Sequence, residues 1–128
     1  MEKEYLKDFD DFKEMSAWKI SMNVSEKVFD ITKKLPKKED YGLTSQIRRS
    51  TNSIGANIAE GFGRSHKMDK VQYYTYSISS AYETLHHLRY GRKIGYFENS
   101  DVESISNKIK QIIFELNKLN KSIKNYWE

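Results

Sequence analysis

Few residues in the sequence have the types and spacing that catalysis requires. Glu83 and His86 form a Glu-x-x-His pair, which helical bundles use to hold two iron ions. Such a site needs a second pair and two further inward-facing carboxylates, and no other segment supplies them. His66 with Asp69 is a weaker candidate, and neither a glycine-rich phosphate loop nor a nucleophile elbow occurs. We therefore expect no enzyme activity, no catalytic residue, no metal site and no cofactor.

Two clusters of positive side chains suit contact with phosphate groups. The stretch "HHLRYGRK" (86–93) holds Arg89, Arg92 and Lys93 and no acidic residue. The stretch "KKLPKK" (33–38) supplies Lys37 and Lys38, and further lysines follow in the last segment. Such contacts give nucleic-acid binding that depends on charge more than on base sequence. The alternative is a lysine-rich surface that is only solvated.

A ladder of polar residues follows one face of the second helical segment at offsets of 4, 4, 3 and 4: Arg49, Ser53, Asn57, Glu60 and Arg64. One interpretation is a surface that touches phosphate through Arg48, Arg49 and Arg64. The other is a partly buried network in which Glu60 pairs with Arg64 or with an arginine across a subunit contact. We favour the network, because the ladder mixes acid, amide and base.

Aromatic side chains form a second face on the third helical segment. Its members project away from the apolar seam within an arc of about 100°: Tyr73, Tyr76, His87 and Tyr90. A lone bundle has no use for such a face, and tyrosine is favoured at protein interfaces. We interpret it as a subunit interface, and stacking on nucleic-acid bases is the alternative.

The elements that must position these residues are helices. Interruptions at 33–42, with the only proline, at 60–69 and at 93–101 leave four segments with helical periodicity. The last segment has a heptad seam, whose members are Val102, Ile105, Ile109, Ile112, Leu116, Leu119, Ile123 and Tyr126. Four amphipathic helices with short connections predict an all-α fold, an antiparallel up-down-up-down four-helix bundle. In that fold, 33–38 and 86–93 lie at the same end.

The glycines of the second segment need an explanation, because glycine weakens a helix interior by about 0.8–1.0 kcal/mol relative to alanine. At Gly55 we expect two helix backbones to approach closely. Gly61 and Gly63 are expected to end the helix in a left-handed conformation.

Composition limits the remaining choices. The chain has 128 residues, a net charge of +4 and no cysteine, and no apolar run is long enough for a membrane span. Residues 1–15 hold six acids and three bases, a balance of −3, so the remainder carries +7. We expect one domain over 1–128 with an acidic, mobile N-terminal arm at 1–10, and a cytoplasmic location.

The segment "EDYGLTSQIRRSTNSIGANIAEGFGR" (39–64) resembles the signature of the 23S rRNA intervening-sequence protein family. Further similar positions are Trp18, the Leu35-Pro36 break, "SSAYETL" (79–85) and "IGYF" (94–97). The shared structural motif includes Tyr41, Gly42, Asn57, Glu60 and Gly61. Two positions depart from the pattern, since the family often has proline at 55 and an apolar residue at 52.

The resemblance implies an all-helical bundle that assembles into a ring, typically a pentamer. It also implies similarity to the accessory protein of diversity-generating retroelements, a basic ring that partners a reverse transcriptase and nucleic acid. No catalytic residue is carried over from the family.

These observations predict a non-catalytic homo-oligomer that binds RNA or DNA by charge and shape, as an accessory to another protein, with no membrane partner. Its predicted phosphate-binding residues are Arg89, Arg92, Lys93, Lys37, Lys38, Arg48, Arg49 and Arg64. The alternative is a protein scaffold that recruits a partner through "YGLTSQIRR" (41–49) and binds no nucleic acid.

Overall fold

The structure is a computed structural model that describes residues 11–126. Within that range the chain forms four α-helices, two short 3-10 helices and no strand. The α-helices are α2 (Ser16–Thr32), α3 (Leu43–Gly63), α4 (Lys67–Lys93) and α5 (Asn99–Tyr126). The 3-10 helices are η1 (Phe12–Glu14) and η2 (Lys37–Glu39). The acidic arm expected at 1–10 lies outside the described residues.

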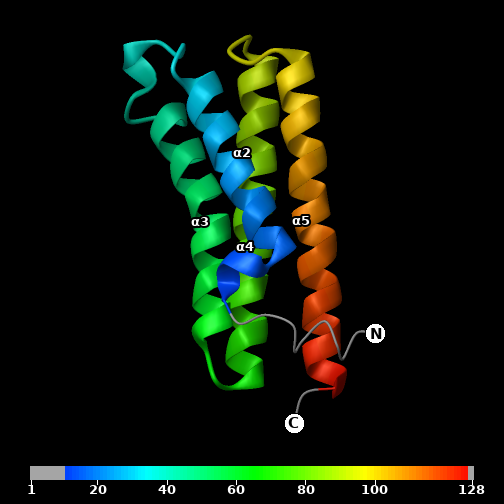
Figure 1. The fold of residues 1–128 in the computed structure, drawn as a ribbon. Helices are drawn as coiled ribbons and strands as arrows, with labels where there is room; N and C mark the ends of the chain where they lie inside the picture. Colours follow the sequence, from blue (N-terminus) through cyan, green and yellow to red (C-terminus); the bar gives the residue numbers. More distant parts are fainter. Residues whose placement is uncertain (1–10, 127–128) are drawn as a thin grey trace.

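The four helices pack around one core (Figure 1). Helix α3 packs on α2 and α4, and α5 packs on the same two helices. The connections 33–42 and 94–98 lie at one end of the bundle, and the short connection 64–66 lies at the other (Figure 1). The sequence prediction of an all-helical fold with four helices is therefore confirmed.

Helix α5 forms because 28 residues without glycine or proline repeat an apolar heptad. Its seam is buried from Val102 to Ile123, and only Tyr126, at 46% exposure, lies outside the core. Helix α4 buries Tyr74 and Leu88 in the same way, and α3 buries Ile47 and Ile54. The periodicity of the sequence thus identifies the side of each helix that faces the core.

The glycines of α3 serve close packing. A Cβ atom on Gly55 would lie 2.8 Å from Oγ of Ser21 in α2, and one on Gly61 would lie 2.7 Å from the ring of Tyr74 in α4. The prediction of left-handed conformations at Gly61 and Gly63 is wrong: in residues 11–126, positive φ occurs only at Gly95. Helix α3 continues to Gly63, and within it Gly61 leaves the space that the Tyr74 ring occupies.

Candidate nucleic-acid interface

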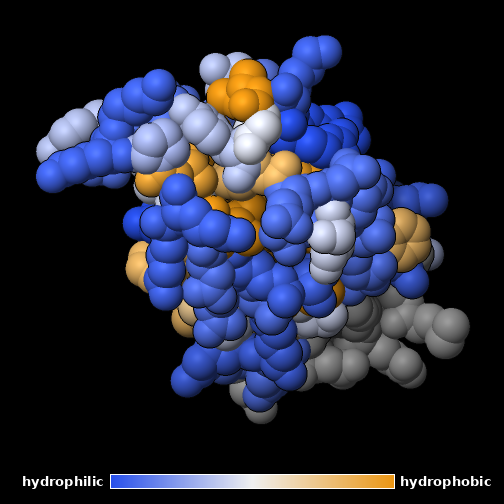
Figure 2. Space-filling view, turned by 90° about the horizontal axis from the view of Figure 1, so that it is seen from above, coloured by the Kyte–Doolittle hydropathy of each residue, from blue (hydrophilic) through white to orange (hydrophobic). Residues whose placement is uncertain are grey.

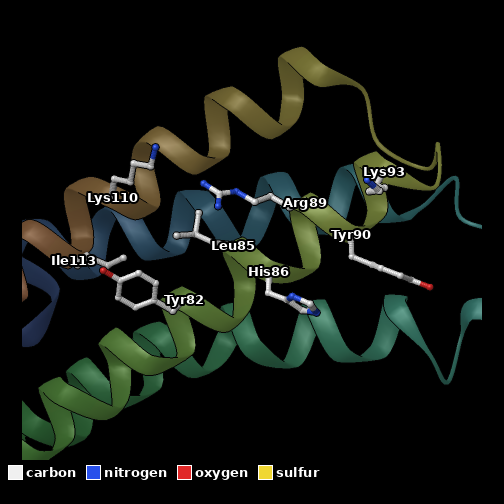
Figure 3. A pocket seen from close by; sticks show the side chains of 8 residues that line it. All are labelled: Tyr82, Leu85, His86, Arg89, Tyr90, Lys93, Lys110 and Ile113. Carbon is white, nitrogen blue, oxygen red and sulfur yellow. The ribbon is translucent and has the colours of Figure 1, made fainter.

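A groove of about 690 Å³ runs along α4 beside α5 (Figure 3). Six of its lining residues belong to α4 and two to α5: Tyr82, Leu85, His86, Arg89, Tyr90, Lys93, Lys110 and Ile113. The α4 residues recur every three or four positions, so the helix presents them on one side. In Figure 3 Arg89 lies on the side of α4 that faces α5, and Lys110 extends from α5, while His86 and Tyr90 extend from the other side of α4. Leu85 and Ile113 are buried and form an apolar floor.

The charge of this groove is entirely positive. Its lining contains three cations, Arg89, Lys93 and Lys110, and no carboxylate. Within the described part of the chain, no ion pair joins any of these three side chains to an acidic residue. Arg92 differs, because its Nη1 donates to Oδ1 of Asn99 at 3.1 Å and to Oε2 of Glu103 at 3.2 Å. Arg89 and Lys93 are therefore available to an anionic ligand, and Arg92 is held at the start of α5.

Lys37 and Lys38 lie on η2, in the connection at the same end of the bundle as Lys93 (Figure 1). Both side chains are exposed. Viewed onto this end, the molecule presents mainly hydrophilic side chains around a hydrophobic centre (Figure 2). The structure thus brings the two sequence clusters to one end, as the topology predicts.

Three predicted phosphate-binding arginines make contacts within their own chain. Arg48 donates from Nε to Oγ1 of Thr32 at 2.8 Å, and its guanidinium lies 4.3 Å from the ring centroid of Phe29. Both partners belong to the last turn of α2, so Arg48 fastens α3 to α2. Arg64 donates to Glu60 at 2.9 Å and to the hydroxyl of Tyr73 at 2.8 Å. Arg64 thereby joins α3 to α4.

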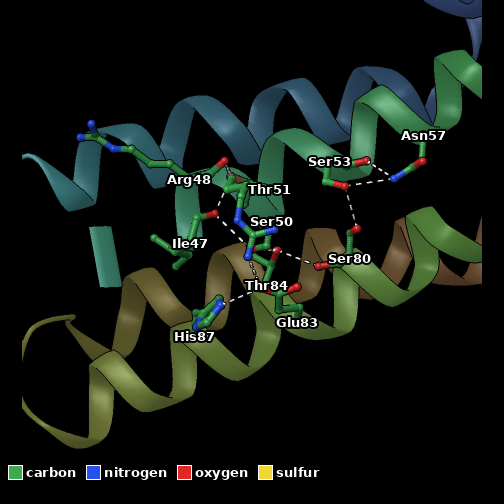
Figure 4. A network of polar contacts seen from close by, with 11 residues as sticks. Ile47, Arg48, Ser50, Thr51, Ser53, Asn57, Ser80, Glu83, Thr84 and His87 are labelled. Carbon is green, nitrogen blue, oxygen red and sulfur yellow. Dashed lines mark hydrogen bonds and ion pairs between the residues drawn. The ribbon is translucent and has the colours of Figure 1, made fainter. Parts of the chain in front are cut away.

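The third, Arg49, belongs to a polar network between α3 and α4 (Figure 4). Its Nη2 lies 3.4 Å from Oε2 of Glu83, and the same oxygen lies 3.1 Å from Nε2 of His87. Glu83 therefore pairs with His87, four residues on, in place of the His86 that a Glu-x-x-His metal motif would use. No cluster of three or more metal-binding side chains occurs among residues 11–126.

The same network continues along the helices through short hydroxyl side chains. Ser50 and Thr84 share a hydrogen bond of 2.8 Å, and Ser80 donates to Ser53 at 3.0 Å. Asn57 donates back to the carbonyl oxygen of Ser53 at 2.9 Å within its own helix. The small, polar composition of α3 thus provides close contact with α4 and partners for the polar groups enclosed there.

The predicted aromatic interface divides into two groups. His87 is only 8% exposed and shares Glu83 with Arg49 of α3, and the Tyr73 ring lies 4.5 Å from the guanidinium carbon of Arg64, so both side chains lie on the flank of α4 that faces α3. Tyr76 and Tyr90 remain exposed, at 45% and 50%. His87 therefore departs from the exposed position that the helical arc predicts, because α3 covers that flank of α4.

Residues of the sequence motif near 41 hold the two connections together. Oε1 of Glu39 accepts from the backbone N–H of Leu43 at 3.1 Å, and Oε2 accepts from the Tyr96 hydroxyl at 2.9 Å. The Leu43 hydrogen bond, followed by the one from Tyr96, lowers the pKa of the Glu39 carboxyl. A Cβ atom on Gly42 would lie 2.7 Å from Oε1 of Glu39, so glycine leaves room for this carboxylate. Tyr41 is 97% exposed and makes no comparable structural contribution.

Sequence reasoning missed Tyr82 as a groove residue, and it did not single out His86 within "HHLRYGRK" or Lys110 among the lysines of the last segment. The signal was present as offsets of 4, 3 and 4 through Tyr82, His86, Arg89 and Lys93. It was hidden because each of these residues is exposed and apolar periodicity does not detect them. Which α5 residues lie opposite depends on the packing of α4 on α5.

Comparisons with known proteins bear on the family. The family model described as 23S rRNA-intervening sequence protein matches residues 13–118. A crystal structure of a protein with unknown function from the S23 ribosomal protein family of Bacteroides thetaiotaomicron has the same fold, with a TM-score of 0.74. The two are 23% identical, and the match covers 82% of this chain and 98% of that one. No curated protein matches the sequence.

None of the described helices has the length and hydropathy needed to cross a membrane. The family model covers most of the chain, including the motif at 39–64 and the groove residues of α4 and α5. The chain belongs to the 23S rRNA-intervening sequence protein family.

Proposed function

We propose that this protein is a non-catalytic, homo-oligomeric bundle that binds RNA or DNA by charge and shape through the groove between α4 and α5. The observation that carries the proposal is the set of three cations, Arg89, Lys93 and Lys110, in a groove without a carboxylate. Phosphate groups of a nucleic-acid backbone would supply the missing negative charge and release condensed counterions. Lys37 and Lys38 extend the positive surface at the same end.

The proposed assembly is a ring, typically a pentamer, of antiparallel up-down-up-down bundles. The alternation of the three connections between the two ends supports the antiparallel order. A ring would repeat the groove around its axis, so that weak phosphate contacts in each subunit add to a useful total. Exposed Tyr76 remains the candidate for the subunit contact, whereas Tyr90 lines the groove and is assigned to the alternative, contact with nucleic-acid bases.

The proposed setting is that of a cytoplasmic accessory factor. The resemblance to the accessory protein of diversity-generating retroelements supports a role beside a nucleic-acid-processing partner. The proposal assigns binding to the groove and no reaction, and it includes no cofactor and no membrane.

The test is fluorescence anisotropy with labelled RNA and DNA, titrated at several salt concentrations. Binding should weaken linearly in log–log form as salt increases, with a slope of about −0.9 per phosphate neutralised on duplex DNA. Changing Arg89, Lys93 and Lys110 to Gln should weaken binding and reduce the slope by about two to three.

A matched control removes three charges elsewhere on the surface. Lys118, Lys121 and Lys124 are exposed lysines further along α5, outside the groove. Changing them to Gln should reduce affinity much less than the groove triple. Equal losses from the two triples would show that total charge, not the groove, determines binding.

The second candidate is a scaffold ring that recruits a protein and binds no nucleic acid. The exposure of Tyr41, 97% at the start of the "YGLTSQIRR" segment, favours this candidate. If the protein has the expected particle mass and still binds no nucleic acid at low salt, the scaffold candidate is favoured over the groove proposal.

A further inference from the structure

The groove combines two kinds of chemistry, and a duplex backbone uses only one of them. Its cations suit phosphates, which single strands and duplexes both present. Its other feature is a set of exposed aromatic rings, with Tyr82 at 58% and Tyr90 at 50% exposure. A large aromatic side chain left in water is informative when it lines a concave site. We infer that the groove binds unpaired nucleotides, with bases stacked on its rings, in preference to duplex; this inference rests on the proposed function.

The rings are arranged as a stacking surface. The imidazole of His86 and the phenol of Tyr90 are nearly parallel, with an interplanar angle of 17° and ring centroids 6.5 Å apart. Because the two ring planes have nearly the same orientation, a base that stacks on one ring is nearly parallel to the other. Tyr82 stands one turn before His86 on the same side of α4. Successive bases of a single strand can stack on such rings whatever their identity, because every base has a π face.

The apolar floor fits the same ligand. Leu85 and Ile113 are 7% and 8% exposed and line the groove together with the rings and the cations. A volume of about 690 Å³ is within the range of about 300–1,000 Å³ typical of small-molecule pockets. The groove therefore has room for a base. In a duplex the faces of the bases are covered by their neighbours, so neither the rings nor the floor would gain a contact.

The positions of the cations agree with this assignment. Arg89 and Tyr90 are consecutive in α4, and Lys93 follows about one turn later. Cationic and aromatic side chains therefore alternate along this part of the helix. Lys110 supplies a cation from α5 on the side of the groove away from His86 and Tyr90 (Figure 3). A single strand could place its phosphates on the α5 side and its bases over the rings. This combination of cations that follow the backbone and rings that hold the bases is typical of single-strand binding.

The test compares a labelled single-stranded DNA oligonucleotide that cannot self-pair with its own duplex, at one salt concentration. The unmodified protein should bind the single strand at least about tenfold more tightly. The double variant Tyr82→Leu with Tyr90→Leu keeps apolar bulk and removes the rings. It should weaken single-strand binding by about fivefold or more and leave duplex binding unchanged within about twofold.

A control variant and a second readout make the test specific. Tyr126→Leu replaces a tyrosine of similar exposure, 46%, on α5 outside the groove, and should change neither affinity. With 2-aminopurine in the single strand, binding should change the fluorescence of this base analogue, and the double variant should abolish that change.

The outcomes separate this inference from the proposed function. If the double variant binds single strands as well as the unmodified protein while the groove triple loses affinity, stacking is refuted and phosphate binding stands. Equal affinity for both DNA forms would also overturn the single-strand preference. If neither form binds at low salt, the proposed function fails and the inference fails with it.

Discussion

Replacing Gly61 with alanine should destabilise the protein, whereas the same replacement at Gly63, two residues further along α3, should stabilise it. Neither glycine has a positive φ, so both backbones accept alanine without strain. Alanine then gains up to about 0.4–1 kcal/mol, because it lowers the conformational entropy of the unfolded chain. At Gly63 nothing lies within 4 Å of the new Cβ, so the gain is unopposed.

At Gly61 the new Cβ would lie 2.7, 2.9 and 3.2 Å from three ring carbons of Tyr74. That ring is 3% exposed and belongs to the core, so it cannot move without disturbing its neighbours. Overpacking of this kind costs about 1–3 kcal/mol, which leaves a net loss of up to about 2.6 kcal/mol after the gain from alanine.

The assay is urea unfolding of both variants beside the unmodified protein, at one protein concentration because assembly affects apparent stability. Two results would refute the reasoning. If both alanines destabilise the protein equally, the glycines serve the backbone conformation after all. If Gly61→Ala is as stable as Gly63→Ala, the Tyr74 ring does not require the space.

Three further predictions concern polar contacts. The pKa of the Glu39 carboxyl is lowered, so its carboxylate stabilises the fold fully at pH values above the ordinary pKa of 4.5, and this stabilisation is lost as pH falls through the pKa of the folded state. The variant Glu39→Gln should therefore be less stable than the unmodified protein at pH 7 and should lose less stability on acidification. Urea unfolding at several pH values measures both effects. Glu83→Gln should cost about 1–3 kcal/mol, because it weakens the acceptor that the buried His87 shares with Arg49, and equal stability would show that these two contacts do not require a carboxylate. Arg48→Lys should lower the melting temperature, because lysine loses the planar contact with the Phe29 ring, and it should leave nucleic-acid affinity unchanged. A fall in affinity at constant stability would show instead that Arg48 contacts nucleic acid.

Much of the fold follows from periodicity. The seam of α5 predicts its buried side from Val102 to Ile123, because apolar residues at heptad spacing can only be covered together. The unusual composition around Gly55 likewise predicts close helix contact, and the position of Ser21 agrees with it. The motif at 39–64 predicts the family, which the match over residues 13–118 confirms.

What periodicity misses is the flank of a helix that a neighbour covers. Tyr73, His87 and Tyr90 share an arc on α4, yet α3 covers His87 and leaves Tyr90 half exposed. That division depends on the crossing of α3 and α4, which local sequence does not specify. The groove depends in the same way on packing, because Lys110 comes from a different helix.

Gly61 shows a different limit. A glycine near a helix end is usually a left-handed terminator, and the sequence around it contains a second glycine that supports this expectation. The competing reason, space for the Tyr74 ring, comes from a residue 13 positions further along the chain on another helix. Local rules cannot rank the two reasons without the tertiary contact.

The hydrogen bond between Glu39 and Tyr96 has a consequence for the order of folding. These residues are 57 positions apart, and the whole of α3 and α4 lies between them. Closing such a long loop has an entropic cost that earlier contacts must offset, so we expect the bond to form after the two helices have docked. On this expectation, the end that carries Lys37 and Lys93 is completed late in folding, and a nascent chain acquires its full charged surface only once the bundle is assembled.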